Sequence, residues 1–193
     1  MNALIAGLVL FLGVHSLRIV ADRWRSAQIA RRGEGPWKAV YSLLSLAGLA
    51  LIVWGYGIAR QQPVPLWAPA PNWLRTVAAA LTLPAFVLLA AAYVPHNAIK
   101  ARLHHPMLLG VKLWALAHLL ANHTLADLLL FGAFLAWAVV AFAAARRRDR
   151  GAAASTSASS GAATLMAFLA GAVAWVVFAF WAHDWLIGVS PLG

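Results

Sequence analysis

The sequence predicts an all-α fold: a polytopic transmembrane helical bundle of about six spans, with both termini on the periplasmic side. Hydrophobic residues make up 63% of the 193-residue chain, and the mean hydropathy is +0.79. Only 10% of the residues are charged, compared with about 25% in an average soluble domain. Several apolar runs reach the roughly 17–25 residues that a helix needs to cross a bilayer core. Basic residues gather in alternate loops, and this alternation sets the predicted orientation.

The six expected spans follow one another along the chain. They cover Ala3–Ala21, Lys38–Ala59, Leu74–Val94, Met107–Asn122, Leu125–Ala145 and Thr164–Gly188. The first span lacks the basic segment and the small-residue cleavage site of a secretory signal, so we expect it to be retained. We treat residues 1–193 as a single transmembrane domain. A flexible cytoplasmic linker, rich in alanine and serine, is expected at about 146–163.

Local signals support individual span ends. Pro36 and Pro106 each fit the first turn of a helix, where the missing N–H costs nothing. Thr124 and Asp127 have capping-box spacing, which predicts where the fifth span begins. Pro84 predicts a kink in the third span, and a neighbouring helix can satisfy the carbonyl that this proline frees.

Basic residues distinguish the two faces of the predicted bundle. The connections after the first, third and fifth spans carry Arg23, Arg25, Arg31, Arg32, Lys38, Lys100, Arg102, Arg146, Arg147, Arg148 and Arg150. The opposite connections carry Arg60 and Arg75. The positive-inside rule therefore predicts a multi-pass protein of a bacterial inner membrane, with the basic loops in the cytoplasm. Because these loops explain the net charge of +10, we expect the lipid bilayer as partner and no nucleic acid.

One histidine lies inside the first predicted span. Ionisable groups at the centre of a span cost roughly 2.5–3.5 kcal/mol when charged, and they usually mark functional sites. Arg18 follows His15 by three residues and shares its face of the helix. The pair suits haem, with the imidazole on the iron and the guanidinium on a propionate. The alternative is structural: His15 bonds a carbonyl of a neighbouring helix, and Arg18 extends to lipid headgroups.

A second histidine lies inside the fourth predicted span. Trp114, His118 and Asn122 repeat at four-residue spacing and therefore line one face of the helix. Trp114 suits the wall of a flat cofactor, and Asn122 can orient a group near the outer surface. The alternatives are an interhelical hydrogen bond for His118 and a helix cap for Asn122. The chain has no cysteine, so any metal must bind histidine, methionine, carboxylate or backbone. The sequence thus predicts a buried metal or haem site and leaves catalytic residues undefined.

The depth of the two histidines in the membrane leaves the second axial ligand open. Two axial imidazole nitrogens lie about 4 Å apart when each metal bond is roughly 2 Å long. At about 1.5 Å per residue, His15 lies ~9 Å from the cytoplasmic end of its span and His118 ~18 Å. A deeper start or a tilt of the fourth span would reduce this mismatch. If neither occurs, His104 or His105 is the better partner for His15.

Several segments resemble the NnrU family. They are Arg102-Leu103-His104-His105-Pro106-Met107, Leu113-Trp114-Ala115-Leu116-Ala117-His118-Leu119-Leu120-Ala121-Asn122, His15-Ser16-Leu17-Arg18 and Leu186-Ile187-Gly188-Val189-Ser190-Pro191. That family takes its name from a gene linked to nitrite and nitric oxide reductase activity in denitrifying bacteria. Its plant relatives include 15-cis-zeta-carotene isomerase, a membrane enzyme that holds b-type haem through histidine. The resemblance implies haem b on His15 and His118, with Arg102 and His105 near the cofactor edge. Because cysteine is absent, the thiolate ligand exchange proposed for the plant branch cannot occur here.

Three functions compete at this point. The first is a haem-b membrane protein that supports denitrification through electron transfer, nitric oxide sensing or reductase maturation, with a redox partner or the reductases themselves as partners. The second is a haem-dependent cis–trans isomerase of a hydrophobic polyene. The third is a cofactor-free membrane subunit in which the histidines only connect helices. A family fold alone does not establish isomerase chemistry.

Overall fold

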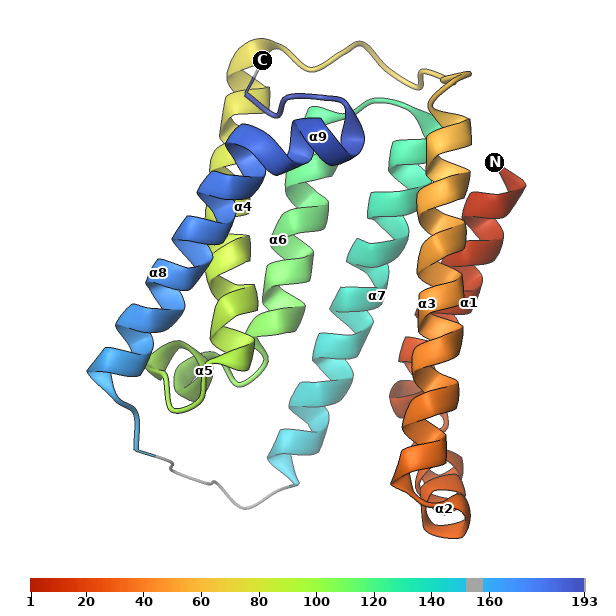
Figure 1. The fold of residues 1–193 in the computed structure, drawn as a ribbon, viewed down its shortest axis with the longest axis vertical. Coiled ribbons are helices and arrows are strands. Elements are labelled where there is room, and N and C mark those ends of the chain that lie inside the picture. Colours follow the sequence, from red (N-terminus) through yellow and green to blue (C-terminus); the bar gives the residue numbers. More distant parts are fainter. Residues whose placement is uncertain (152–157, 193) are drawn as a thin grey trace. The chain divides into compact units, whose positions relative to one another are not determined.

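The computed structural model describes residues 1–151 and 158–192 (Figure 1). Its helices are α1 (Asn2–Val20), α2 (Asp22–Arg32), α3 (Glu34–Ala59), α4 (Asn72–Tyr93), α5 (Ala98–Leu103), α6 (Pro106–Ala121), α7 (Leu125–Arg150), α8 (Gly161–Val177), the π-helical turn η1 (Phe178–Ala182) and α9 (His183–Ile187). Among the described residues, five helices are long and apolar enough to cross a membrane: α1, α3, α4, α7 and the α8–α9 run Gly161–Ile187. With the shorter apolar helix α6, they confirm the predicted polytopic helical bundle.

The helices belong to two compact units. Unit 1 comprises Met1–Leu66 and Thr124–Ala133, and unit 2 comprises Trp67–His123 and the chain from Phe134 onward. The boundary between the units falls inside α7. Each unit has its own packing and its own cavity.

Unit 1 is built on a close seam between α1 and α3. Gly7, Gly48 and Gly55 lie where the two backbones approach each other. A Cβ on Gly7 would come within 2.6 Å of the Ile52 backbone nitrogen, and one on Gly48 within 2.8 Å of the Phe11 nitrogen. Small residues allow this approach, which is a common means of helix association in membranes.

Helix α2 corrects one prediction. The sequence suggested only a connection from Asp22 to Lys38, whereas Asp22–Arg32 is helical and packs against α1 and α3. The local reason is charge placement, because Asp22 lies in the first turn and Arg31 and Arg32 in the last, where each complements the helix dipole. Gly33, with φ of 85°, ends the helix and lets α3 begin at once.

Unit 2 is built around α4, which packs against both α6 and α8 (Figure 1). Gly171 of α8 permits the closest approach, because a Cβ there would lie 2.5 Å from the Val87 Cα atom. Further along α8, Trp175 donates from Nε1 to the Thr82 hydroxyl (2.8 Å) and to the Ala79 carbonyl (3.3 Å). As residue numbers rise in α8 they fall in α4, so the two helices run antiparallel. The two acceptors lie five and two residues before Pro84, which remains inside α4.

The last span departs from the continuous helix expected over Thr164–Gly188. A π-helical turn, Phe178–Ala182, separates α8 from α9. Gly188 ends α9 in the left-handed region with φ of 73°, and its N–H bonds the Asp184 carbonyl. π-turns of this kind are often found at functional sites.

Predicted helix ends are largely confirmed. Pro106 occupies the first turn of α6. The Thr124 N–H donates to Asp127 Oδ2 (2.9 Å), and the Asp127 N–H to Thr124 Oγ1 (3.3 Å), which completes the capping box of α7. Helix α7 continues to Arg150 and α8 begins at Gly161, so the ends of the predicted linker are helical. The middle of that linker, residues 152–157, lies outside the described residues.

Candidate functional site

Five of the predicted site residues line two cavities, and the other two, Arg102 and His105, line neither. His118, Trp114 and Asn122 line a cavity in unit 2, which we call the unit-2 cavity. His15 and Arg18 line a cavity in unit 1, the unit-1 cavity. Each predicted cluster is therefore brought together locally, as helix periodicity requires.

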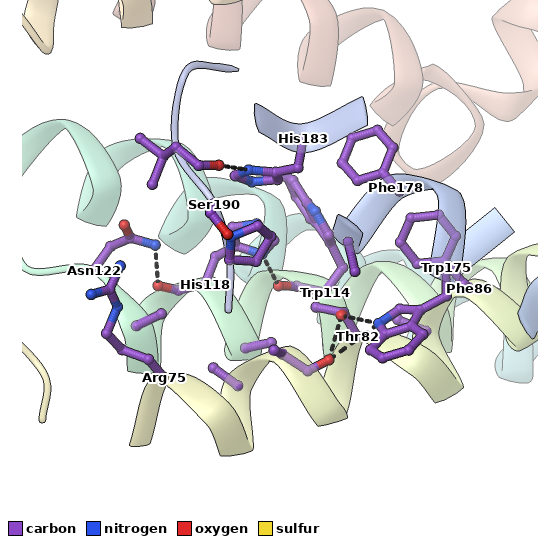
Figure 2. Close-up of a pocket in the computed structure, with 18 of the residues that line it drawn as sticks. Arg75, Thr82, Phe86, Trp114, His118, Asn122, Trp175, Phe178, His183 and Ser190 are labelled. Carbon is purple, nitrogen blue, oxygen red and sulfur yellow. Dashed lines mark hydrogen bonds between the residues drawn. The ribbon is translucent and has the colours of Figure 1, made fainter. Parts of the chain in front are cut away.

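The unit-2 cavity is the main candidate site. Its volume is about 360 Å³, which is in the range of sites for small organic ligands. Residues of α4, α6, α7, α8 and the C-terminal segment line it, and Figure 2 labels Arg75, Thr82, Phe86, Trp114, His118, Asn122, Trp175, Phe178, His183 and Ser190. Alanine, phenylalanine and tryptophan side chains supply most of the wall. The cavity is therefore apolar, with a few polar groups at defined places.

His118 has a fixed tautomer in its neutral form. Its Nδ1 lies 2.8 Å from the Trp114 carbonyl oxygen, one turn earlier in α6. A carbonyl can only accept, so Nδ1 carries the proton and Nε2 carries the lone pair. Metal-bound histidines commonly use this arrangement, in which one ring nitrogen donates to a carbonyl and the other binds the metal. Asn122 supports the same turn by donating to the His118 carbonyl (2.8 Å).

Aromatic side chains enclose the cavity. The Trp114 ring lies 5.1 Å from the His118 ring and 5.5 Å from the Phe134 ring, centroid to centroid. On the α8 side, Phe178 contacts Phe86 at 5.6 Å. Trp175 is held by its hydrogen bond to Thr82 (Figure 2). Such flat, rigid walls suit a planar and largely apolar ligand.

One end of the cavity carries the polar groups. Arg75 of α4 and Asn122, which directly follows α6, lie at this end, and the C-terminal segment Val189–Pro191 lies beside them (Figure 2). His183 donates from Nδ1 to the Val189 carbonyl (2.6 Å), which fixes that segment across the cavity. A guanidinium at the rim of an apolar cavity is suited to an acidic substituent of the ligand.

Sequence reasoning did not assign most of these residues to a site, among them Arg75, Trp175, Phe178 and His183. The sequence did contain a pattern that places some of them on one face of a helix, because Trp175, Phe178 and Ala182 are three and four residues apart. In a span that is apolar all round, however, that spacing does not reveal which face meets a cavity. His183 could not be placed, because the π-turn before it changes the face on which it lies.

In unit 1, His15 and Arg18 lie near the basic end of α1. His15 donates from Nδ1 to the Phe11 carbonyl (2.7 Å). Its ring stacks on Phe11 at 4.2 Å and lies 5.3 Å from the Tyr41 ring. The carbonyl bond fixes the same tautomer as in His118.

The segment around His104 and His105 forms the turn from α5 to α6. His104 ends α5 with φ of 61°, a conformation that few residues other than glycine adopt. His105 Nε2 lies 2.9 Å from Asp149 Oδ2, and its ring meets the Phe142 ring edge-on. Arg102 is exposed on α5. Arg102 and His105 are not among the residues that line either cavity; the segment forms a turn that the His105–Asp149 hydrogen bond ties to α7.

The described residues hold no group of three or more histidine, aspartate or glutamate side chains that could hold a metal ion by themselves. Haem is a different case, because its porphyrin supplies four ligands and the protein needs to supply only axial ones. His118 Nε2, the aromatic walls and Arg75 fit such a group: an imidazole for the iron, flat surfaces for the ring and a cation for a propionate.

Comparison with known proteins now bears on this site. The chain matches the family model described as NnrU protein over residues 3–191. The chain belongs to the NnrU family. This confirms the resemblance carried by the sequence segments around His15, His105 and His118. No curated protein sequence and no solved structure matches the chain significantly.

Proposed function

We propose that this NnrU protein binds haem b in the unit-2 cavity and supports denitrification from the membrane. The observation that carries the proposal is His118, whose Nδ1–H is bonded to the Trp114 carbonyl inside an aromatic-lined cavity. The family name supports the link to denitrification. The multi-pass architecture supports a place in a membrane.

The side chains of the cavity have distinct parts in this proposal. His118 Nε2 would bind the haem iron, and the Trp114 carbonyl holds the imidazole ring in orientation. Trp114 and Phe178 would exclude water from a bound haem, and Arg75 would bind one of its acidic substituents. Bound haem would supply one-electron chemistry or a binding site for a diatomic gas. Electron transfer, nitric oxide sensing and reductase maturation are the roles consistent with that chemistry.

An absorption spectrum of the detergent-purified protein tests the proposal. The chain is expressed with haem supply, and oxidised and dithionite-reduced spectra are recorded with a pyridine haemochrome assay. We expect stoichiometric b-type haem in the wild type and its loss, or a changed spectrum, in His118→Ala. His123→Ala is the matched control, because His123 lies in the turn after α6 and does not line the cavity.

Two further variants test the other predicted ligands. His15→Ala examines the residue that the sequence paired with His118, and His183→Ala examines the second histidine lining the unit-2 cavity. A folded wild type without haem, or unchanged haem in His118→Ala, would contradict the proposal. In a denitrifying host, we expect His118→Ala to slow nitrite consumption relative to His123→Ala.

The apolar lining of the unit-2 cavity favours a second candidate function, cis–trans isomerisation of a hydrophobic polyene. A polyene needs an apolar binding surface, and alanine and aromatic side chains supply one in this cavity. Incubation of the haem-containing protein with a cis-polyene, followed by chromatographic separation of isomers, distinguishes the two. Isomer conversion that His118→Ala abolishes would favour this function over a role in denitrification.

A further inference from the structure

A second cavity lies at the basic end of unit 1. Its volume is about 310 Å³, and its lining residues come from the end of α1, from α2 and from the start of α3. His15, Arg18, Arg25, Trp37, Lys38 and Tyr41 are among the residues lining it. Because α1 and α3 are membrane-spanning helices, their ends and α2 lie at the level of lipid headgroups.

Positive charge predominates in this cavity. Arg18, Arg25 and Lys38 line it together with a single carboxylate, that of Glu34. Lys38 and Glu34 form a 3.0 Å pair whose side chains are 70% and 69% exposed, so this pair is weak. Arg25 lies 3.7 Å from Asp22. Among the described residues, no ion pair to Arg18 is found. The lining therefore keeps an excess of cationic hydrogen-bond donors.

Aromatic side chains give the cavity the character of a membrane interface. Trp37 lines it and meets Trp24 of α2 edge-on at 5.9 Å. Tyr41 lines it one turn further along α3 and contributes a hydroxyl group. Tryptophan and tyrosine prefer the headgroup level of a bilayer, where one part of the ring is apolar and the other is hydrated. The unit-1 cavity thus combines cations with residues typical of the lipid–water boundary.

We propose that the unit-1 cavity binds the phosphate of an anionic phospholipid headgroup. Arg18 and Arg25 present planar donors suited to phosphate oxygens, and Lys38 adds a point charge. The acyl chains of the lipid would extend along the apolar faces of α1 and α3. This site does not depend on haem in unit 2, and it gives Arg18 a role other than contact with a propionate.

Competition between lipids tests the proposal on the full-length protein. The detergent-purified chain is incubated with equal amounts of phosphatidylglycerol and phosphatidylcholine, and retained lipid is measured by native mass spectrometry. We expect the wild type to retain phosphatidylglycerol preferentially. Each of Arg18→Gln, Arg25→Gln and Lys38→Gln should weaken that retention about fivefold, since one cation near an anionic headgroup contributes that much. Arg18→Lys, which keeps the charge, should retain more lipid than Arg18→Gln.

A matched triple variant separates the cavity from the general charge of this end. Arg23→Gln, Arg31→Gln and Arg32→Gln together remove three cations of α2 that do not line the cavity. We expect this triple variant to keep its preference, whereas the triple variant of Arg18, Arg25 and Lys38 loses it. Equal loss in both would overturn the proposal, because the preference would then come from the overall positive field.

Inorganic phosphate distinguishes the two sources of the same chemistry. Excess inorganic phosphate should reduce phosphatidylglycerol retention in the wild type without binding tightly by itself. Tight phosphate binding that requires Arg18, in protein without a preference for phosphatidylglycerol, would overturn the assignment to a lipid. Thermal unfolding shows whether each variant is folded. If a triple variant does not fold, the single variants still decide the test.

Discussion

At the residue scale, three histidines share one hydrogen-bonding pattern. His15, His118 and His183 each place Nδ1 within hydrogen-bond distance of a backbone carbonyl, at 2.7, 2.8 and 2.6 Å. For His15 and His118 the acceptor is the carbonyl four residues earlier in the same helix. An imidazole in a span is thereby satisfied on one nitrogen without help from a neighbouring helix. The structural alternative for His15 and His118 was a hydrogen bond to a carbonyl of another helix. Their Nδ1 atoms do not need such a bond, because each has an acceptor in its own helix.

Asp127 shows how a carboxylate is accommodated in an apolar helix. Its side chain is only 5% exposed, and both oxygens accept hydrogen bonds. Tyr56 donates its hydroxyl to Oδ1 at 2.5 Å, and Thr124 donates its hydroxyl to Oδ2 at 2.6 Å. The capping box supplies two more bonds, so Asp127 connects α3 to the start of α7 within unit 1.

Removal of this carboxylate should lower stability. In Asp127→Ala, the Tyr56 hydroxyl and the Thr124 N–H both lose their acceptor, and each buried orphan costs about 1–3 kcal/mol. We expect a clear decrease in unfolding free energy, measured by chemical denaturation in mixed micelles. Asp127→Asn should lose less, because its amide oxygen can still cap the helix. Asp184→Ala serves as a control in an exposed position, and an equal loss there would contradict the argument.

At the element scale, small residues decide how closely the helices pack. The α1–α3 seam is narrow only where Gly7, Gly48 and Gly55 face the partner helix. Gly57 lies two residues after Gly55 in the same helix, yet a Cβ there would meet nothing within 4 Å. The two glycines thus differ in packing while they share a sequence environment.

This contrast predicts opposite effects of the same substitution. Gly55→Ala would place its Cβ against the Leu4 backbone, where no side chain can rotate away. We expect a loss of about 1–3 kcal/mol, typical of overpacking. Gly57→Ala should be neutral or stabilising by up to about 1 kcal/mol, since alanine favours helix. Thermal unfolding in detergent compares the two variants, and similar effects would refute the close seam.

The sequence was sufficient for those elements whose signal is local. Pro106 and the Thr124–Asp127 pair marked helix starts, because capping depends on residues three positions apart. It was not sufficient for α2, whose polar sequence has no apolar periodicity to predict it. The sequence also did not predict which faces of α4 and α8 line the unit-2 cavity. Trp175 meets Thr82, more than 90 residues apart in the chain, and only tertiary packing brings them together.

At the scale of the whole molecule, charge and length determine how the chain meets the bilayer. Helix α6 has 16 residues and is therefore about 24 Å long, less than the roughly 30 Å of a hydrocarbon core. His105 and Asp149 are hydrogen-bonded at the basic end of unit 2, where Arg146 lies 3.6 Å from the same carboxylate. Polar side chains thus lie directly before the first residue of α6, as a short span requires.

The predicted orientation is open to direct measurement because the chain has no cysteine. Single cysteines can be introduced at Ser26 in α2 and at Gln62 after α3, both exposed. The positive-inside rule predicts that a membrane-impermeant maleimide labels Gln62→Cys in intact spheroplasts and Ser26→Cys only after permeabilisation. The reverse pattern would show that the basic loops lie outside, and the cysteine-free wild type provides the background.

The π-helical turn Phe178–Ala182 has a geometric consequence for the end of the chain. Such a turn contains one residue more than an α-helical turn, and each α-helical residue rotates the chain by about 100°. The angular position of His183, and with it the direction in which Val189–Pro191 crosses the cavity, therefore depends on that one additional residue. Deletion of one residue from this span would hardly change the mean hydropathy of the span. The same deletion would rotate the His183 imidazole by about a quarter of a revolution around the helix axis.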